Sequence, residues 1–599
     1  MKILITTLNS KYIHTSLSIR YLKSYCENDF PNIEIDEYTI NQNNEYISSE
    51  IFRKSPDVVA FACYIWNIES TLDIAQRLKI VNPNIRIILG GPEVSFDGKS
   101  IVEKNPFIDF IIFGEGEETF KVLLTQLSQN GNDFSDIEGL IYRQGNEIYQ
   151  NAPRPLIENL DTIPSPFIKG AKDFENRIVY FESSRGCPFN CRFCLSSTIK
   201  GVRYFSIERV KQDLKRLIDA KVKQVKFVDR TFNAKKEYAL EIMQFIVEQN
   251  VTDINFHFEV TAHLLDDDIL SFLEHIPKGL FQFEIGVQST NPATLEIIDR
   301  NTDFEKLKKV TSKIKSYNNI HQHLDLIAGL PHENYNTFRK SFNDVYSLRA
   351  DKLQLGFLKL LKGSGLRQDV EKYGFKFLDK PPYEVLENNY ITYNQLLKLK
   401  GIEDLVEKYG NEFYFENSIN FIIYNYYDTP FDFYSEFSEY WQEKGHQRVS
   451  HSRTELYRIL FDFYLSGIEN NLEIFKEVLR FDFIYNNKSP NVPKYIKNDN
   501  SDYLKKQKHD FLKNEDNVSK YIPKHANLPA KKIINDVYFE EFNLNILDFI
   551  KYKYDLNNIK YSKSIILFVY DFKNVFNRCQ CFNVTDEFKK IGSDCCESN

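Results

Sequence analysis

Short apolar runs alternate with amphipathic segments along residues 1–130, and this pattern predicts the first domain. The runs expected to form strands are residues 3–7, 33–40, 58–64, 85–89 and 110–113. Between them, residues 16–25 and 70–80 repeat apolar positions every three or four residues, which predicts helices. Strands that alternate with helices in this way favour a parallel sheet covered on both faces. Sheets of this kind bind ligands at the carboxyl ends of their strands.

The same alternation returns along residues 178–360 and predicts a second domain. The expected strands are residues 179–182, 222–228, 254–260, 281–287, 324–328 and 353–358. Helical patterns, such as 207–217 and 238–248, lie between them. Six strand–helix units predict a partial (β/α)6 barrel, in which polar and glycine residues at the strand ends mark the place of the chemistry.

The other segments follow different patterns. Residues 139–150 read as a hairpin with Gly145-Asn146 at its turn, and a proline-marked linker follows it. Residues 380–480 carry Tyr and Phe at helical spacing, which predicts a buried helical face. Residues 486–528 are rich in Asn, Lys and Asp, so we expect a loose linker or a surface excursion there. A small α/β piece with a strand at 564–570 closes the chain.

We therefore predict an α/β chain of four parts. Residues 1–135 form a doubly wound, Rossmann-like parallel sheet, and residues 136–174 form the hairpin and linker. Residues 175–370 form the partial barrel, and residues 371–599 form a mostly helical C-terminal domain with the small α/β piece. A chain of 599 residues is too long for one hydrophobic core, which agrees with this division.

Composition narrows the setting and the partners. No run of about 18 uncharged apolar residues occurs, which argues against a membrane span. The N-terminus lacks the pattern of a signal peptide, so we expect a cytoplasmic protein. A net charge of −8 argues against a nucleic-acid binder that relies on a broad basic surface. Nine unevenly clustered cysteines indicate metal ligation in a reducing compartment rather than disulfides.

Three of these cysteines carry the most information about chemistry. Cys187, Cys191 and Cys194 have the spacing Cys-x3-Cys-x2-Cys, which brings three thiolates within reach of one centre. A structural zinc site takes four protein ligands, and so does a four-iron cluster that only carries electrons. Three thiolates leave one iron open to a substrate or a cofactor. We therefore interpret these residues as the ligands of a reactive, catalytic cluster.

The run around these cysteines, with Phe193 before the third, resembles the cluster loop of the radical S-adenosylmethionine (SAM) superfamily. The resemblance implies a [4Fe-4S] cluster whose open iron chelates SAM. It also implies reductive cleavage of SAM to a 5′-deoxyadenosyl radical that abstracts hydrogen from a substrate. Strand-end motifs in the family's order extend the likeness, although Gln288 stands where many relatives carry Glu. The residues that it assigns to SAM are Phe193, Asp229, Glu259, Gln288, Gly329 and Pro331.

The segment before the barrel resembles the cobalamin-binding domain of the cobalamin-dependent radical SAM class. The matching pieces are the turn Gly90-Gly91-Pro92 and the turn from Gly114 to Thr119. The Asp-x-His-x-x-Gly signature of cobalamin methionine synthases is absent, which leaves the lower axial position on cobalt undefined. His14 could approach the cofactor or occupy a solvated helix start. The residues assigned to cobalamin are His14, Tyr64, Gly90, Gly91, Glu93, Gly114, Glu115, Gly116 and Thr119.

The resemblance implies a cobalamin-dependent radical SAM enzyme, which we interpret as a methyltransferase acting on an unactivated carbon of an unknown substrate. Its reductant would be a flavodoxin or a ferredoxin. Four alternatives stay open: cyclisation, rearrangement or electron transfer assisted by cobalamin, and a non-catalytic iron–sulfur or corrinoid sensor. A tRNA methylthiolase has a comparable cysteine loop, but the acidic chain argues against it. Cys579, Cys581, Cys595 and Cys596 either bind a second metal centre or mark a reactive tail.

Overall fold

The computed structural model describes residues 1–599 except 169–170, 489–490, 499–503, 527, 571–578 and 595–599. Cys595 and Cys596 lie outside the described residues. The described chain divides into two compact units. The first unit holds residues 1–344, 348–351 and 355–396, and the second holds 345–347, 352–354 and 397–599. The N-terminal sheet and most of the barrel therefore belong to one unit.

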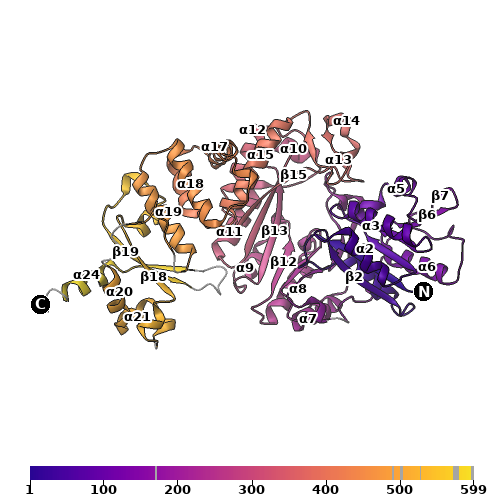
Figure 1. Ribbon diagram of the computed structural model, residues 1–599, viewed down its shortest axis with the longest axis horizontal. Coiled ribbons are helices and arrows are strands. Elements are labelled where there is room, and N and C mark those ends of the chain that lie inside the picture. The colour runs from indigo at the N-terminus through magenta and orange to yellow at the C-terminus, as the bar shows by residue number, and fades with distance from the viewer. Residues whose placement is uncertain (169–170, 489–490, 499–503, 527, 571–578, 595–599) are drawn as a thin grey trace. The chain divides into compact units, whose positions relative to one another are not determined.

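A seven-stranded sheet forms the N-terminal part of the first unit (Figure 1). Its order is β2-β1-β3-β4-β5-β6-β7, with parallel pairings from β2 to β5. The hairpin that we grouped with the linker pairs antiparallel with β5 and extends this sheet. The strands are β1 (Ile3–Asn9), β2 (Ile33–Thr39), β3 (Val58–Ala62), β4 (Arg86–Gly90), β5 (Phe110–Ile112), β6 (Leu140–Gln144) and β7 (Glu147–Gln150). The helices are α1 (Leu17–Cys26), α2 (Asn44–Arg53), α3 (Ile68–Val81), α4 (Pro92–Ser95), α5 (Gly98–Lys104) and α6 (Gly116–Ser128).

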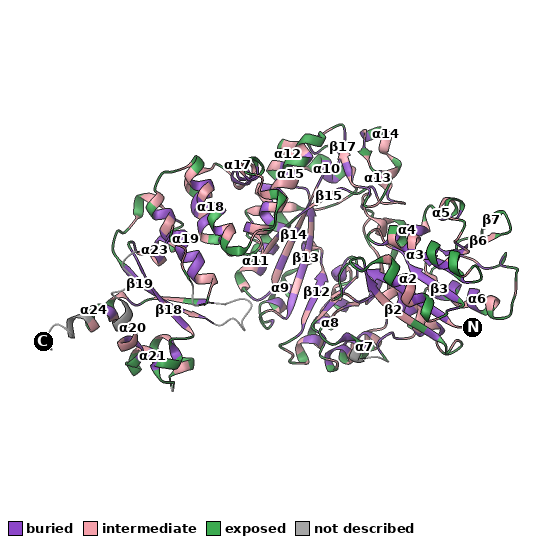
Figure 2. Ribbon diagram, in the orientation of Figure 1, coloured by how far each residue is buried: buried purple, intermediate pink, exposed green. Residues whose placement is uncertain are grey.

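Both faces of this sheet are covered by helices. Successive side chains of a strand point to opposite faces, so neighbouring residues enter different cores. Leu4 and Val59 pack with α2 and α3 on one face, whereas Ile5 and Ala60 pack with α1 and α6 on the other. Burial along the central strands is nearly continuous (Figure 2). The prediction of a doubly wound parallel sheet is confirmed.

A six-stranded sheet in the order β8-β11-β12-β13-β14-β15 forms the partial barrel, and its pairings from β8 to β14 are parallel. This confirms the predicted partial barrel. Its strands are β8 (Ile178–Phe181), β11 (Gln224–Phe227), β12 (Asn255–Glu259), β13 (Phe281–Gln288), β14 (His321–Ala328) and β15 (Lys352–Phe357). Its helices are α7 (Ile207–Asp219), α8 (Lys236–Glu248), α9 (Asp267–Leu273), α10 (Pro292–Ile297), α11 (Phe304–Tyr317) and α12 (Tyr335–Tyr346).

A two-stranded ribbon that the sequence patterns did not predict closes the cysteine loop. Strands β9 (Ser184–Cys187) and β10 (Gly201–Tyr204) pair antiparallel, so Cys187 lies opposite Gly201. Gly186 has a φ of +104°, and a Cβ on it would lie 2.1 Å from the carbonyl oxygen of Gly201. Only glycine allows the two backbones to approach this closely. The ribbon fixes both ends of the loop that carries the three cysteines.

After β15 the first unit continues through α13 (Gly365–Gln368), α14 (Val370–Tyr373), β16 (Lys376–Phe377) and β17 (Val385–Glu387) to the start of α15 (Tyr393–Leu405). The second unit is mostly helical, as predicted, and contains an antiparallel sheet in the order β18-β19-β20. Its strands are β18 (Val537–Phe542), β19 (Ser564–Tyr570) and β20 (Cys579–Asn583). Its helices after α15 are α16 (Glu416–Tyr426), α17 (Pro430–Glu443), α18 (Arg453–Gly467), α19 (Leu472–Asn486), α20 (Leu504–Lys513), α21 (Glu515–Tyr521), α22 (Ala530–Ile533), α23 (Ile546–Lys551) and α24 (Thr585–Asp594).

The expectation of a loose linker at 486–528 needs correction. Helices α20 and α21 form there, because a few apolar side chains in this polar stretch pack onto the small sheet. Phe511 and Val518 are buried in one cluster with Phe539 of β18 and Leu567 of β19. The polar average composition of this segment gave no sign of these few buried apolar residues.

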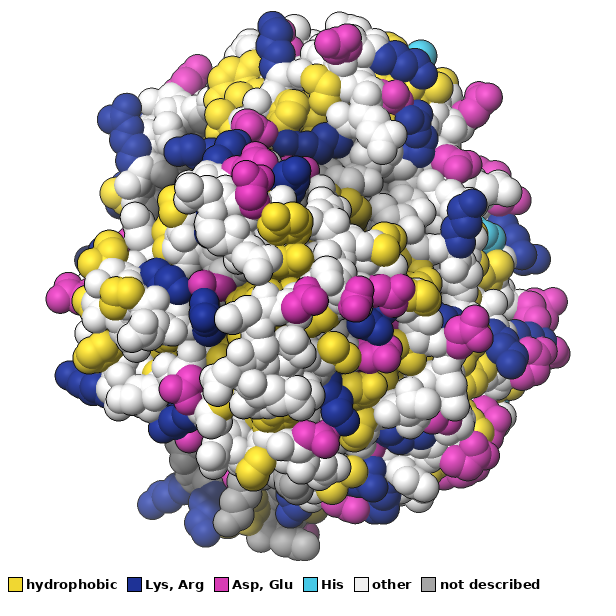
Figure 3. All heavy atoms as spheres, turned by 90° about the vertical axis from the view of Figure 1, so that its right-hand side faces the viewer, with side chains coloured by type: hydrophobic (Ala, Val, Ile, Leu, Met, Phe, Trp, Pro, Cys, Tyr) yellow, Lys and Arg dark blue, Asp and Glu magenta, His cyan; other side chains and the backbone are white. Residues whose placement is uncertain are grey.

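Among the described helices, none has the length and apolar character to cross a membrane. On the face that Figure 3 shows, acidic and basic side chains are interspersed. That face has no broad field of a single sign, which agrees with the modest net charge of −8.

Gly186→Ala should open the ribbon, because the added Cβ meets backbone that cannot rotate away. We expect the amides of β9 and β10 to lose their protection from hydrogen exchange. Gly201→Ala is the matched control, since Gly201 also has a positive φ (+79°) but nothing lies within 4 Å of its Cβ position. Equal protection in the two variants would contradict the proposed close approach.

Candidate functional site

Three thiols from one loop line a single pocket at the carboxyl end of the barrel. Cys187 ends β9, and Cys191 and Cys194 follow on the loop that the ribbon closes. The backbone N–H of Cys194 donates to the carbonyl oxygen of Cys191 at 3.0 Å. All three cysteines line the pocket together with residues of β12, β13 and β14.

Arg300 provides the positive charge at this loop. Its Nη1 lies 3.6 Å from Cys191 Sγ, and its Nη2 donates to the carbonyl oxygen of Gly286. Burial raises the pKa of the Cys191 thiol, and the Arg300 guanidinium opposes that rise. A nearby cation favours the thiolate that binds metals. Arg192, which lies between the second and third cysteines, pairs with Asp369 instead.

Half of the residues assigned to SAM by resemblance line this pocket, namely Phe193, Glu259 and Gln288. Gln288 ends β13 after a bulge that begins at Gly286, and its φ of +71° lies in the left-handed region. Bulges and strained residues of this kind re-aim side chains at functional sites. The bulge explains how the last residue of β13 comes to line the pocket.

The other three assigned residues, Asp229, Gly329 and Pro331, are not among those lining the pocket. Asp229 is buried and accepts hydrogen bonds from the Ser183 backbone N–H at 2.9 Å and the Ser184 hydroxyl at 2.6 Å. It therefore joins the ends of the first two barrel strands. Gly329 turns the chain after β14 with a φ of +90°, and its carbonyl accepts from Asn388 at 2.8 Å.

Two further carboxyl groups in the pocket were missed, Glu284 on β13 and Asp325 on β14. A hydrogen bond from His257 and the charge of Lys226 lower the pKa of Glu284 to about 2, although burial opposes this. Burial raises the pKa of Asp325 to about 7, and it raises that of Glu259 to about 7 as well. The pocket thus combines one carboxylate that is ionised at neutral pH with two whose pKa values lie near 7. The alternation of polar and apolar residues along β13 and β14 was the available signal.

The glycine turns assigned to cobalamin lie at the carboxyl ends of β4 and β5. Gly91 has a φ of +108°, and a Cβ there would lie 2.6 Å from the carbonyl oxygen of Cys63. Gly114 has a φ of +81° and nothing within 4 Å of its Cβ position, so its turn borders open space. Gly90 is the last residue of β4 and the first of its turn, and Gly116 begins α6 at the second turn.

Two aromatic side chains after β3 form a stack beside these turns. The ring of Tyr64 lies 4.6 Å from that of Trp66, with only 2° between their planes. Both polar ends are engaged, since the Tyr64 hydroxyl lies 2.9 Å from Ser18 Oγ and Trp66 Nε1 donates to the carbonyl of Leu8. Trp66, which was not assigned to cobalamin, is 47% exposed.

His14 and Thr119 make contacts within the protein. His14 Nδ1 lies 3.1 Å from the hydroxyl of Tyr180 on β8, so the imidazole faces the first barrel strand. Its backbone bridges Ile178 at the start of that strand. Thr119 is buried, donates to the carbonyl of Glu138 and accepts from Arg154. These contacts give Thr119 a structural role.

The two glutamates assigned to cobalamin are engaged in ion pairs and hydrogen bonds. Glu115 accepts from Arg203 at 2.8 Å and from the Ile157 backbone N–H at 2.8 Å. Although burial opposes it, these bonds lower the pKa of Glu115 below its usual value. Glu93 is buried and bonds to Tyr383 of the segment after β15.

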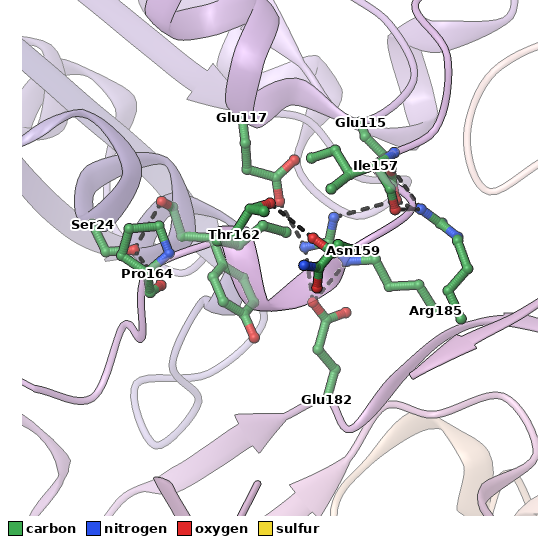
Figure 4. Close-up of polar contacts among 12 residues, drawn as sticks. Ser24, Glu115, Glu117, Ile157, Asn159, Thr162, Pro164, Glu182 and Arg185 are labelled. Carbon is green, nitrogen blue, oxygen red and sulfur yellow. Dashed lines mark hydrogen bonds and ion pairs between the residues drawn. The ribbon is translucent and has the colours of Figure 1, made fainter. Parts of the chain in front are cut away.

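Arg185, two residues before Cys187, joins the sheet domain to the barrel (Figure 4). Its guanidinium lies 2.6 Å from Glu117, 2.8 Å from Glu182 and 3.3 Å from Glu115. All four side chains are at least 86% buried, because the most exposed of them retains 14% of its surface. Burial raises the pKa of Glu182 to about 7, and Arg185 opposes the rise. The start of the cysteine loop is thus tied to the Gly114–Glu117 turn.

Family comparisons agree with this arrangement. The models of the B12 binding domain, the Radical SAM superfamily and a protein of unknown function (DUF4080) match residues 3–124, 181–345 and 371–568. The chain belongs to the cobalamin-binding radical SAM family. The cofactors of these domains are cobalamin, SAM and a [4Fe-4S] cluster.

Curated relatives are similar to this chain, and a solved structure shares its fold. The cobalamin-dependent radical SAM methyltransferase TokK of Streptomyces tokunonensis is 27% identical over 55% of this chain and 51% of that protein. The uncharacterized methyltransferase PH0819 of Pyrococcus horikoshii is 29% identical over 53% of this chain and 70% of that protein. The chain thus spans about half the length of the first of these relatives. The structure of the cobalamin-dependent radical enzyme OxsB shares the fold at a TM-score of 0.54, with 14% identity over 80% of this chain and 79% of that one.

The thiols of this cobalamin-binding radical SAM protein form a donor set that fits a cluster. Cys187, Cys191 and Cys194 stand around one pocket. Cysteine thiolates are the ligands of [4Fe-4S] clusters, and three of them leave one iron without a protein ligand. Among the described residues, no group of three or more His, Cys, Asp or Glu side chains is placed to hold a single metal ion.

Arg185→Met should destabilise the first unit, because three buried carboxylates lose the cation that they share. Breaking a buried ion pair from one side costs about 3–5 kcal/mol. Urea unfolding in a Trp441→Phe background measures this, since the chain has two tryptophans and Trp66 then reports the first unit alone. Arg86→Met is the control, because Arg86 is 50% exposed in its pair with Asp109 and should contribute less than about 1 kcal/mol. Equal effects in both variants would contradict the assigned role of Arg185.

Glu333 should make stability depend on pH. It is buried, accepts from Ser289 at 2.6 Å and Ser341 at 2.8 Å, and burial raises its pKa to about 7. The protonated form therefore stabilises the fold fully below the unfolded pKa, and this contribution is lost as pH rises through 7. Relative to Glu333→Gln, the wild-type free energy of unfolding should fall by about 2 kcal/mol between pH 5.5 and 7.5. A constant difference over that range would show that Glu333 does not titrate there.

Proposed function

We propose that this chain is a cobalamin-dependent radical SAM methyltransferase that acts on an unactivated carbon of its substrate. One observation carries the proposal: three thiols line a pocket whose loop is tied, through Arg185, to the turn of the B12-binding domain. A radical site and a methyl carrier must lie close together for such chemistry. The ion-pair network supports that proximity, since it joins the two loops directly.

Cys187, Cys191 and Cys194 would hold the cluster and leave one corner for SAM. When bound, the cluster and SAM supply radical chemistry, and cobalamin supplies the methyl group. Arg300 donates to Cys191 and would stabilise the thiolate there. Phe193 offers an aromatic face for adenine. Glu259 and Gln288 supply polar groups for the amine or the ribose of SAM.

The remaining pocket carboxyls would serve the substrate. Glu284 stays ionised because His257 Nε2 lies 2.9 Å and Lys226 Nζ 3.1 Å from it. It can therefore accept hydrogen bonds at neutral pH. Asp325 can donate or accept, since its pKa lies near 7. A polar group of the substrate would be oriented by these two side chains.

The proposal includes a reductant of the flavodoxin or ferredoxin type. It also includes a cytoplasmic setting, because free thiols that bind iron need a reducing compartment.

Anaerobic purification with cobalamin supplied tests the cofactor set. We expect about four irons and one corrinoid per chain. Cys191→Ala should lose most of the iron and keep the corrinoid. Cys26→Ala is the matched control, because Cys26 is a buried thiol in α1 outside the pocket. Zinc in place of iron would overturn the proposal.

The two uses of SAM can be measured without the substrate. With a reductant, the loaded protein should form 5′-deoxyadenosine from SAM by cleavage and S-adenosylhomocysteine by methylation of cobalt. Formation of S-adenosylhomocysteine should require cobalamin. If only 5′-deoxyadenosine forms, cobalamin has another role, such as the cyclisation named in relatives called magnesium-protoporphyrin IX monomethyl ester cyclases. If neither product forms, the sensor alternative is favoured.

A further inference from the structure

The segment between β15 and α15, residues 358–391, contacts three separate parts of the proposed site, and we name it the clasp. It contains α13, α14, β16 and β17 and belongs to the first unit. The match to the domain of unknown function begins at residue 371, inside the clasp. Part of that domain therefore folds with the barrel. Its contacts are with the cysteine loop, the turn after β14 and the turn after β4.

The clasp holds the middle of the cysteine loop. Asp369 lies 2.5 Å from Arg192, which sits between the second and third cysteines. The backbone N–H of Leu366 donates to the carbonyl of Arg192 at 2.9 Å. Phe193 packs against a hydrophobic cluster that includes Leu366 and Tyr373 of the clasp. The loop is thus fixed by a backbone bond, an ion pair and apolar packing.

The clasp also holds the turn after β14, which the resemblance assigns to SAM. The side-chain amide of Asn388 donates to the carbonyl of Gly329 at 2.8 Å. The hydroxyl of Tyr390 lies 3.0 Å from His332 Nε2. Val385 donates its backbone N–H to the carbonyl of Leu358, which continues the bonding beyond β15.

The third contact is with the Gly90-Gly91 turn of the B12-binding domain. The Tyr383 hydroxyl donates to the Glu93 carboxylate, two residues after Gly91, and Lys362 Nζ lies 3.6 Å from that carboxylate. Lys362 also lies 3.5 Å from Asp97. Gly363 packs on the ring of Phe96, since a Cβ there would lie 2.3 Å from it. The turn and the clasp fit closely at this contact.

Two features of this contact, one in each segment, would be energetically unfavourable without the contact. Glu93 is only 6% exposed, and a buried carboxylate is stable only with hydrogen-bonded or charged partners. Tyr383 has a φ of +58°, a conformation that bulky side chains rarely adopt. Strain of this kind persists where surrounding contacts impose it and is frequent at ligand sites. The bond between Tyr383 and Glu93 provides such a constraint.

We propose that the clasp sets the position of the cobalamin turn relative to the cysteine loop, and that Tyr383 and Lys362 are positioning residues for cobalamin that act through Glu93. The inference rests on the proposed function and assigns a role to the start of the domain of unknown function. Glu93 itself then serves as an anchor of the turn. The clasp connects the turn to Arg192 and Phe193 through one short stretch of chain.

Tyr383→Phe and Lys362→Met test the proposal in the full chain with its cluster reconstituted. Hydroxocobalamin is the probe, and its Kd is measured by spectral titration. Each variant should raise the Kd about tenfold, as the loss of a supporting partner does at metal sites. Iron content and the change that SAM causes in the cluster's EPR spectrum should stay as in the wild type. Tyr373→Phe is the control, because it alters a buried clasp tyrosine on the side of the cysteine loop.

The outcomes separate this inference from the proposed function. A Kd within twofold of the wild-type value in both variants overturns the role of the clasp and leaves the proposed function standing. A wild-type chain that binds no cobalamin overturns both. An equal rise of the Kd in Tyr373→Phe also overturns the inference, since the effect would then be general loosening. If Tyr383→Phe fails to fold, Lys362→Met decides alone.

Discussion

Arg185 places one buried positive charge among three carboxylates where the sheet domain meets the barrel, and the site depends on this interaction. Glu182 belongs to the barrel, whereas Glu115 and Glu117 belong to the sheet domain. A buried cation is stable only when it is paired. The start of the cysteine loop therefore reaches its position only when the sheet domain docks. Arg203 repeats the arrangement on the facing strand, since it binds Glu115 and the carbonyl of Ile157 in the linker.

The N-terminal sheet could be predicted because its central strands are buried on both faces and read as apolar runs. The barrel strands β13 and β14 instead alternate polar and apolar residues, which is also a signal for a strand. The strand that we expected at 564–570 is β19 itself. The ribbon could not be found in this way. Its strands are four residues long, and sequences such as Ser-Arg-Gly-Cys have no apolar alternation. What forms the ribbon is the close approach of Gly186 to Gly201, which is a tertiary contact.

The location of the candidate site was predicted, but only some of the side chains that line it were. Motifs located the strand ends, and Phe193, Glu259 and Gln288 do line the pocket. They did not show which way a side chain turns. Asp229 points to the hydroxyls of Ser183 and Ser184, because a buried carboxylate takes the nearest donors. Glu115 turns to arginines from the other domain for the same reason, and that partnership involves residues 70 and 88 positions apart in the chain.

In the clasp, the boundary of the family match and the boundary of the compact unit lie at different residues. A family model marks where sequences resemble one another, and here it begins at residue 371. The compact unit of the barrel continues to residue 396. Residues 371–396 therefore share a family with the second unit and a core with the barrel, in which Tyr373 and Val385 pack with Leu330 after β14. The first residues of this C-terminal domain are constrained together with the barrel, because Tyr373 packs in the cluster that includes Phe193 of the cysteine loop and Tyr383 bonds to Glu93 beside the Gly90-Gly91 turn.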